Sequence, residues 1–413
     1  MFALFIRREL LPQMHCILIP KTIFFSCHKK GFFLRTCIIT AVFVLTGVYI
    51  SVAQNNNFDS LVSAGIKQIY NIKFENAEKT FSVVAEKYPL HPAGKFFDAM
   101  IVWWKIMLDM DNESYDDTFE DKLDEVIDFC DDLLDKNPDN VDAVFFKGGT
   151  IGFRGRLEAL RENWLSAGLD GKDALPLVYR AYEIDPKNVD VQLGFGIYNY
   201  YAAVIPEEYP AVKPLMIFFP SGDKEKGIEQ LINVAYNGKY AVVEAKYFLM
   251  TLFYRYEKKY DNALKYGKML VREFPDNPRF QRYYGRIIVS QGDYTSSTIV
   301  FKDILRKCKK KYRGYNSEIE READYYIATD FQNKNQIDSA LAYFSNCRKI
   351  SMLIDTDEES GFLINSTLFI GMLLDQSGKS DEAKKYYEEV LDYREYGASH
   401  DLAERYIENP YGK

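Results

Sequence analysis

A pattern of small and aromatic residues that recurs about every 34 residues limits the fold more than any other feature of this chain. In residues 58–89, Gly65 is followed by Ala77, Phe81 and Pro89. Two antiparallel helices can approach closely at the small residues, the aromatic ring fills the gap to the next pair, and proline ends the second helix. Further copies with the same spacing are Gly285, Ser297 and Phe301; Ala328, Ala340 and Phe344; Gly371, Ala383 and Tyr387; and a partial copy around Ala263 and Pro275.

The string from Gly371 to Tyr387, with Gly378 in the turn, carries the pattern most clearly. It resembles the tetratricopeptide repeat, in which each unit is a helix pair whose apolar faces are buried only by neighbouring units. The resemblance implies an all-α fold, a right-handed α-solenoid of stacked antiparallel helix hairpins, with about eight hairpins in this chain.

The middle of the chain departs from this period. Pro89, Pro138 and Pro186 lie 49 and 48 residues apart, which predicts hairpins whose connecting loops are about fourteen residues longer than in the standard unit. Residues 204–222 form a further insertion. The run 194–231 looks like a eukaryotic tetratricopeptide family that includes a mitochondrial outer-membrane protein implicated in clearing cytosolic inclusions, and this resemblance implies shared architecture only.

The N-terminal segment differs from everything after it. A basic stretch ending at Arg35 precedes the uncharged apolar segment 36–52, and small residues before Gln54 suit cleavage after Ala53. We therefore expect residues 1–53 to be an export signal, residues 54–240 to hold hairpins with long insertions, and residues 241–413 to hold regular hairpins. The alternative is a retained membrane anchor over residues 36–52, at the short end of what spans a bilayer.

Charge limits the class of partner. The chain has a net charge of −8 and residues 1–53 are basic, so the remainder is strongly acidic, with fifteen Asp or Glu between Asp109 and Asp142. An acidic body argues against binding nucleic acid, which needs a basic surface. Residues 109–120 place carboxylates at several positions of a calcium loop, but Ser114 stands where that loop needs glycine, so a solvated acidic helix face is favoured.

Arginines supply the candidate ligand-binding residues. In repeats of this family the first helix of each unit lines the concave groove, which places Arg255, Arg279, Arg282 and Arg286 toward it. The last three are spaced by three and four residues and form one stripe on a helix. Such a stripe could hold an anionic peptide, or the acidic loop of a second copy of the chain, through charge-assisted hydrogen bonds. The alternative is a solvated face on the rim.

No pattern in the chain indicates an enzyme, a cofactor or a metal site. Two histidines, His91 and His400, follow the leader, and Gly149, Gly152 and Gly155 match neither a dinucleotide nor a phosphate loop. The aromatic cluster of Trp103, Trp104, Tyr198, Tyr200 and Tyr201 has helical spacing, which favours core packing over a ligand platform.

These features together predict a non-enzymatic scaffold of the bacterial envelope, exported to the periplasm or cell surface, that binds a protein or peptide in its concave groove. The alternative is an accessory subunit of an envelope transport or enzyme complex, held to the membrane by residues 36–52.

Overall fold

The computed structural model describes residues 57–208, 210, 213 and 219–412. The chain divides into two compact units, Met1–Asn57 and Phe58–Lys413, and the helices below belong to the second. The expected export signal and the apolar segment 36–52 lie outside the described residues. Among the helices that are described, none combines the length and apolar character needed to cross a membrane.

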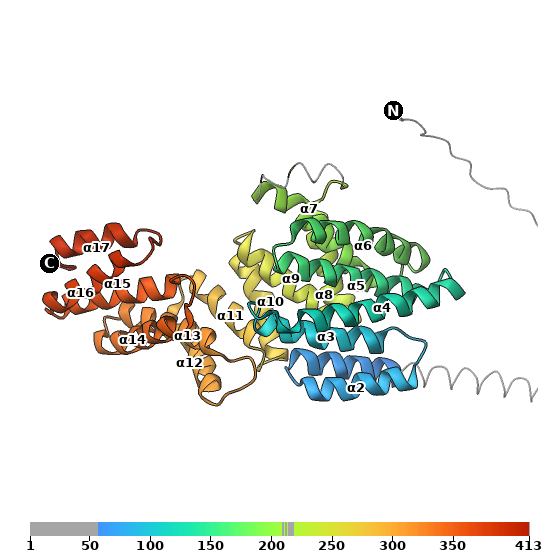
Figure 1. Ribbon diagram of the computed structural model, residues 1–413, viewed down its shortest axis with the longest axis horizontal. Coiled ribbons are helices and arrows are strands. Elements are labelled where there is room, and N and C mark those ends of the chain that lie inside the picture. The colour runs from blue at the N-terminus through green and yellow to red at the C-terminus, as the bar shows by residue number, and fades with distance from the viewer. Residues whose placement is uncertain (1–56, 209, 211–212, 214–218, 413) are drawn as a thin grey trace, which may run out of the picture. The chain divides into compact units, whose positions relative to one another are not determined.

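The second unit is built from helices that follow one another in chain order (Figure 1). The first covers residues 57–70, and two short 3-10 helices lie at Glu113–Tyr115 and Val189–Val191. The others are α2 (Phe74–Lys87), α3 (Ala93–Leu108), α4 (Asp116–Lys136), α5 (Val141–Leu160), α6 (Trp164–Ile184), α7 (Gln192–Glu208), α8 (Lys224–Asn237), α9 (Val242–Arg255), α10 (Tyr260–Glu273), α11 (Pro278–Ser290), α12 (Tyr294–Lys309), α13 (Ser317–Asn333), α14 (Ile337–Ile354), α15 (Gly361–Gln376), α16 (Ser380–Asp392) and α17 (Ser399–Glu408).

Consecutive helices pack against each other as pairs. Helix 57–70 and α2 form the first pair, α15 and α16 form the last, and α17 packs on α16. Over the described residues this gives eight hairpins and one additional C-terminal helix. The expected fold class, an all-α stack of helix hairpins, is therefore confirmed.

The small residues and rings of the repeat meet as the sequence predicts. A Cβ atom at Gly65 would lie 2.4 Å from the ring of Phe81, and one at Gly371 would lie 2.5 Å from the ring of Tyr387. In each case the glycine is on the first helix of a hairpin and the ring is on the second. Only a residue without a side chain lets the ring approach so closely, so the repeat spacing sets how the two helices of a hairpin cross.

The longer central repeats differ from the prediction of long loops. Helices α4, α5 and α6 contain 21, 20 and 21 residues, whereas α11 and α16 contain 13 each. Most of the extra length between Pro89 and Pro186 thus extends helices. The physical reason is that added helical turns satisfy their own backbone hydrogen bonds, which a long loop would not do.

The first hairpin closes back onto helices far along the chain. The Tyr70 hydroxyl donates to Glu244 at 3.0 Å, and the Asn277 side-chain amide donates to the Tyr70 carbonyl at 3.0 Å, across 207 residues. Arg313, after α12, pairs with Glu75 on α2. Residues 57–290 therefore pack around their own interior.

Helix α9 occupies that interior. Every residue from Val243 to Phe253 is buried, including the charged Glu244 and Lys246. One apolar cluster contains residues between Phe58 and Ile287, on both sides of the expected boundary at residue 240. Ala181 of α6 belongs to a separate small cluster with Val144, Val191 and Phe195. The C-terminal hairpins have separate, smaller clusters between Phe301 and Ala403.

Candidate binding sites

Two of the predicted ligand-binding arginines are paired with a buried carboxylate. Arg282 and Arg286, on α11, both bond Glu322 on α13, with Arg282 Nε and Arg286 Nη2 at 2.9 and 2.6 Å from Oε2. Burial of Glu322, which is fully shielded from solvent, favours a raised pKa, but the two guanidinium groups outweigh burial and lower the pKa of this carboxyl. The three side chains join neighbouring first helices of two hairpins.

The other two predicted arginines have different surroundings. The Arg279 guanidinium is 5.7 and 5.8 Å from the ring centres of Tyr247 and Tyr283, and it donates to the Met107 carbonyl at 3.4 Å. Arg255 is exposed near the end of α9. The structure thus brings Arg282 and Arg286 together, uses Arg279 to join α11 to α3, and leaves Arg255 apart. Ligand binding by any of the four stays a prediction.

A small polar pocket of about 50 Å³ lies beside these arginines. Its wall includes Arg279 and Arg282 together with Asp111 and Glu318. A space of this size has room for a few ordered waters.

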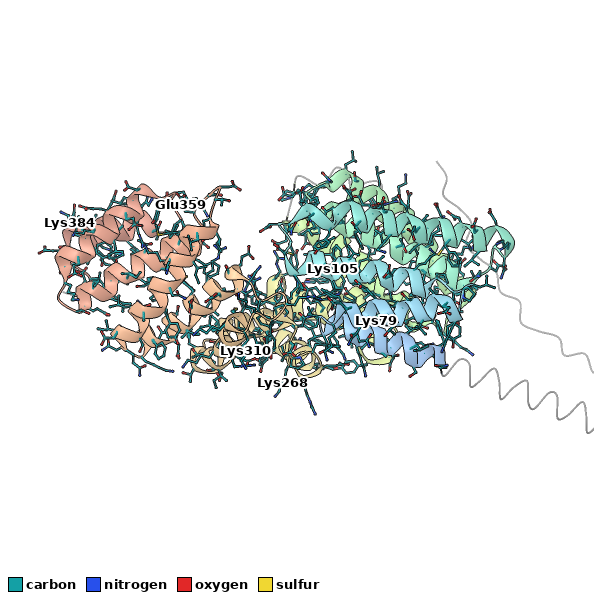
Figure 2. The ribbon with its side chains drawn as sticks, turned by 60° about the horizontal axis from the view of Figure 1, so that its bottom comes forward. Lys79, Lys105, Lys268, Lys310, Glu359 and Lys384 are labelled. Carbon is teal, nitrogen blue, oxygen red and sulfur yellow. The ribbon has the colours of Figure 1, made fainter. Side chains whose placement is uncertain are left out.

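Charged side chains are spread along the unit, as the labelled lysines in Figure 2 illustrate. Within the acidic segment, Asp116 forms an ion pair with Arg161, whose Nη1 donates to the Met110 carbonyl at 2.5 Å. Lys122 and Lys147 pair with carboxylates of α3 and α4. Within the part of the chain that the structure describes, no three His, Cys, Asp or Glu side chains are grouped to hold a metal ion.

The aromatic cluster belongs mainly to the core, as expected. Trp103, Trp104 and Tyr200 are buried, and Tyr198 and Tyr201 are half-buried. Trp104 packs edge-on to Tyr70 at 5.0 Å and to Phe280 at 5.5 Å, so it helps to seal the first hairpin against α11.

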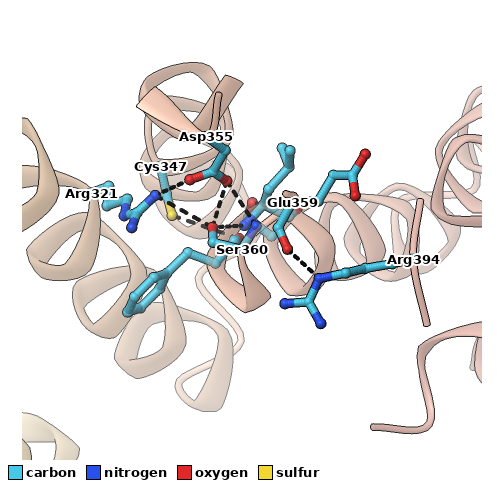
Figure 3. Close-up of polar contacts among 9 residues, drawn as sticks. Arg321, Cys347, Asp355, Glu359, Ser360 and Arg394 are labelled. Atoms are coloured by element: carbon cyan, nitrogen blue, oxygen red, sulfur yellow. Dashed lines mark hydrogen bonds and ion pairs between the residues drawn. The ribbon is translucent and has the colours of Figure 1, made fainter. Parts of the chain in front are cut away.

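A serine, a cysteine and an aspartate gather where α13, α14 and α15 meet (Figure 3). Asp355 accepts hydrogen bonds from the Ser360 backbone N–H at 2.9 Å and from its hydroxyl at 2.6 Å, and it also pairs with Arg321. Ser360 caps α15. Burial raises the pKa of the Cys347 thiol to about 12, so this cysteine is held in its unreactive form. The role of the cluster is therefore to hold α13, α14 and α15 together.

The structure also contains an apolar cavity of about 270 Å³, which the sequence did not reveal. It lies between helix 57–70 and helices α3, α5, α6, α7 and α9. Most lining residues are aliphatic, aromatic or glycine, for example Ile69, Trp104, Phe153, Leu175 and Ile197.

Ionised groups at the cavity wall already have partners. Arg156 Nη1 donates to Glu244 at 3.0 Å, and Glu244 also accepts from the Tyr70 hydroxyl at 3.0 Å. The Arg156 guanidinium stacks on the rings of Trp103, Phe153 and Phe248 at 4.7 to 4.9 Å. These contacts join residues up to 174 positions apart, and no local pattern in the chain signals them.

Comparison with known proteins finds solved structures that match the chain at low similarity. No protein-family profile and no curated protein sequence matches the chain. Several solved structures do, among them PilF from Pseudomonas aeruginosa, with 13% identity over 62% of this chain and 95% of PilF, and a TM-score of 0.39. A chain of the Cut9–Hcn1 hetero-tetramer of the APC/C matches at 13% identity over 80% of this chain and 52% of its own length, with a TM-score of 0.47.

A third match is the C-terminal part of a TPR repeat-containing protein from Cytophaga hutchinsonii, at 15% identity over 74% of this chain and 98% of that one, with a TM-score of 0.36. Similarity at this level carries no argument about function. The resemblance of residues 194–231 to the mitochondrial family stays a prediction.

Proposed function

We propose that this chain is a non-enzymatic scaffold of the bacterial envelope that binds a protein or peptide over the first helices of its C-terminal hairpins, α11, α13 and α15. The observation that carries the proposal is the difference between the two ends of the unit. In residues 57–277, before α11, the inner side is filled by α9, which is buried from Val243 to Phe253. In the later hairpins the first helices keep half-buried positions, among them Arg286 on α11, Tyr325 on α13 and Phe369 on α15.

Side chains on these first helices face one another across neighbouring hairpins. Arg286 of α11 meets Glu322 of α13, and the ring of Tyr325 on α13 lies 6.3 Å from that of Phe369 on α15. Phe369 and Met372 are half-buried. A face that combines partly exposed aromatic and apolar side chains with charged ones suits a peptide that has both kinds of side chain.

A site-specific cross-linker tests where the partner binds. Met372 follows Gly371 on α15 as Arg286 follows Gly285 on α11, so we expect a photoreactive phenylalanine analogue at position 372 to cross-link the partner in envelope fractions. The same analogue at Lys385, which is exposed on α16, is the matched control and should give at least tenfold less product. Equal yields at both positions would show that the partner does not use the first-helix face.

The mass of the chain isolated from its host tests the proposed location. Cleavage after Ala53 predicts a chain that begins at Gln54 and fractionates with the periplasm or cell surface. An uncleaved chain that stays with the membrane after a high-salt wash would favour the alternative, an accessory subunit anchored by residues 36–52. An uncleaved chain in the cytosolic fraction would contradict both locations.

A further inference from the structure

The cavity beside α5 and α6 is kept open at Gly152, a glycine that packing does not explain. A Cβ atom at Gly152 on α5 would meet no other atom within 4 Å, and this half-buried residue lines the cavity. Gly171 on α6 also lines the cavity, but it is exposed, so solvent accounts for the space around it. By contrast, a Cβ at Gly155 would lie 3.0 Å from Asp170, so that glycine is needed where α5 packs on α6. Glycine inside a helix is destabilising relative to alanine, so Gly152 weakens α5 while it leaves space unfilled.

The helix arrangement leaves the cavity wall partly accessible. Helix α6 packs along α5 but makes few contacts with the next helix, α7. On the wall, Phe153, Val178 and Ile197 are only half-buried. A molecule can therefore reach the cavity at this side without unfolding of the closed core.

Charge limits what the cavity can accept. Arg156 is paired with Glu244, and Asp190 accepts backbone N–H groups of Lys239, Tyr240 and Ala241 at 2.8, 2.9 and 3.2 Å. An additional buried charge would find no free partner of opposite sign among these groups, and an unpaired charge is very costly to bury. The buried part of a ligand must therefore be uncharged.

We propose that this cavity binds the uncharged aliphatic portion of a medium-length acyl chain. A cavity of about 150 Å³ holds benzene, so about 270 Å³ holds roughly ten carbon atoms. The recess at Gly152 makes the cavity wall irregular. An unbranched chain with several rotatable bonds fills an irregular apolar space more readily than a rigid ring system, as methionine does in protein cores.

Calorimetric titration of the full chain with a series of n-alkanols from hexanol to dodecanol tests the proposal. Each added methylene that enters the cavity should tighten binding about fourfold, and the gain should stop near ten carbons because the cavity is then full. Saturable binding with this limit is the expected result. The proposal would be overturned if decanol showed no saturable binding. It would also be overturned if affinity kept rising with alkanol chain length, as it does on a flat apolar surface.

A Gly152→Leu variant tests whether the ligand occupies this cavity. Its side chain enters open space, so the variant should unfold at the same or a higher urea concentration than the native chain and should bind decanol at least tenfold more weakly. Gly168→Leu is the matched control on α6, because Gly168 does not line the cavity and its Cβ would meet only Phe219, at 3.8 Å. If Gly152→Leu folds and binds decanol as tightly as the native chain, the proposal is wrong.

Two competitors identify the source of the acyl chain. Displacement of decanol by decanoyl-lysophosphatidylcholine, but not by decanoate, would assign the chain to a lipid. Displacement by decanoate alone would assign it to a free fatty acid whose carboxylate stays at the accessible wall. Failure of both compounds to displace decanol would overturn the assignment to acyl chains.

Discussion

Replacing Glu322 with glutamine should lower the free energy of unfolding by about 3 kcal/mol or more, because removal of one member of a buried ion pair leaves its partners without compensation. Two guanidinium groups, those of Arg282 and Arg286, would lose their carboxylate at once. Urea denaturation followed by circular dichroism measures the change. Glu318→Gln is the matched control, since Glu318 lies on the same helix and makes no ion pair among the described residues.

The pH dependence of this effect has a definite sign. Because the pKa of Glu322 is lowered in the folded chain, its contribution to stability is complete above the pKa of about 4.3 that glutamate has in unfolded chains, and is lost as the pH falls through the folded value. The difference between the native chain and Glu322→Gln should therefore shrink in acid.

A second substitution separates the ion pairs from simple packing. If the cost of Glu322→Gln comes from uncompensated guanidinium groups, adding Arg286→Gln should recover part of the lost stability. A single variant that is as stable as the native chain would show that the Arg282–Glu322–Arg286 cluster does not hold α11 and α13 together. The arginines would then be available for the ligand role that the sequence predicts.

Replacing Asp324 with asparagine should have the opposite effect and stabilise the chain at pH 8 by up to about 4 kcal/mol. Asp324 is 1% exposed on α13, and burial raises the pKa of its carboxyl to about 7. Above that pH the native chain must keep a buried carboxylate ionised, with Glu320 adding repulsion and Lys309 giving partial relief. Asparagine has no charge and can still accept the hydrogen bond from Asn346.

The increase in stability caused by Asp324→Asn should disappear at low pH. Between the unfolded pKa of about 3.9 and the folded value, the folded chain binds a proton that the unfolded chain lacks, so native stability falls as the pH rises through this window. Urea unfolding of both chains at pH 4 and pH 8 measures the difference. Asp338→Asn, at an exposed position on α14, is the control and should change stability little at either pH. If Asp324→Asn changed stability equally at both pH values, burial of the charge would not be the cause.

The sequence predicted the hairpins well because the interactions that define them are local. Gly65 and Phe81 are sixteen residues apart and belong to one hairpin, and Gly371 and Tyr387 have the same separation. A pattern of residue sizes at this spacing is enough to specify a helix pair. It did not specify element lengths, and the expected long loops between Pro89 and Pro186 are mostly extensions of α4, α5 and α6.

The surroundings of the predicted site residues could not be read from the sequence. Helical spacing placed Arg282 and Arg286 on one stripe correctly, but the partner Glu322 is 36 to 40 residues away on another hairpin. Whether a half-exposed arginine faces solvent or a buried carboxylate depends on how two hairpins stack. No short segment of the sequence indicates how the two hairpins stack.

The sequence by itself thus determined an all-α chain, the existence of the hairpins and the crossing of their helices, since each hairpin is a local unit with its own small and aromatic residues. The tertiary structure decided that the first hairpin closes on α9 and α11 through Tyr70, Glu244 and Asn277, and that an apolar cavity remains inside. Closure depends on a small rotation at every hairpin, which accumulates over more than 200 residues. No short sequence pattern indicates the total rotation.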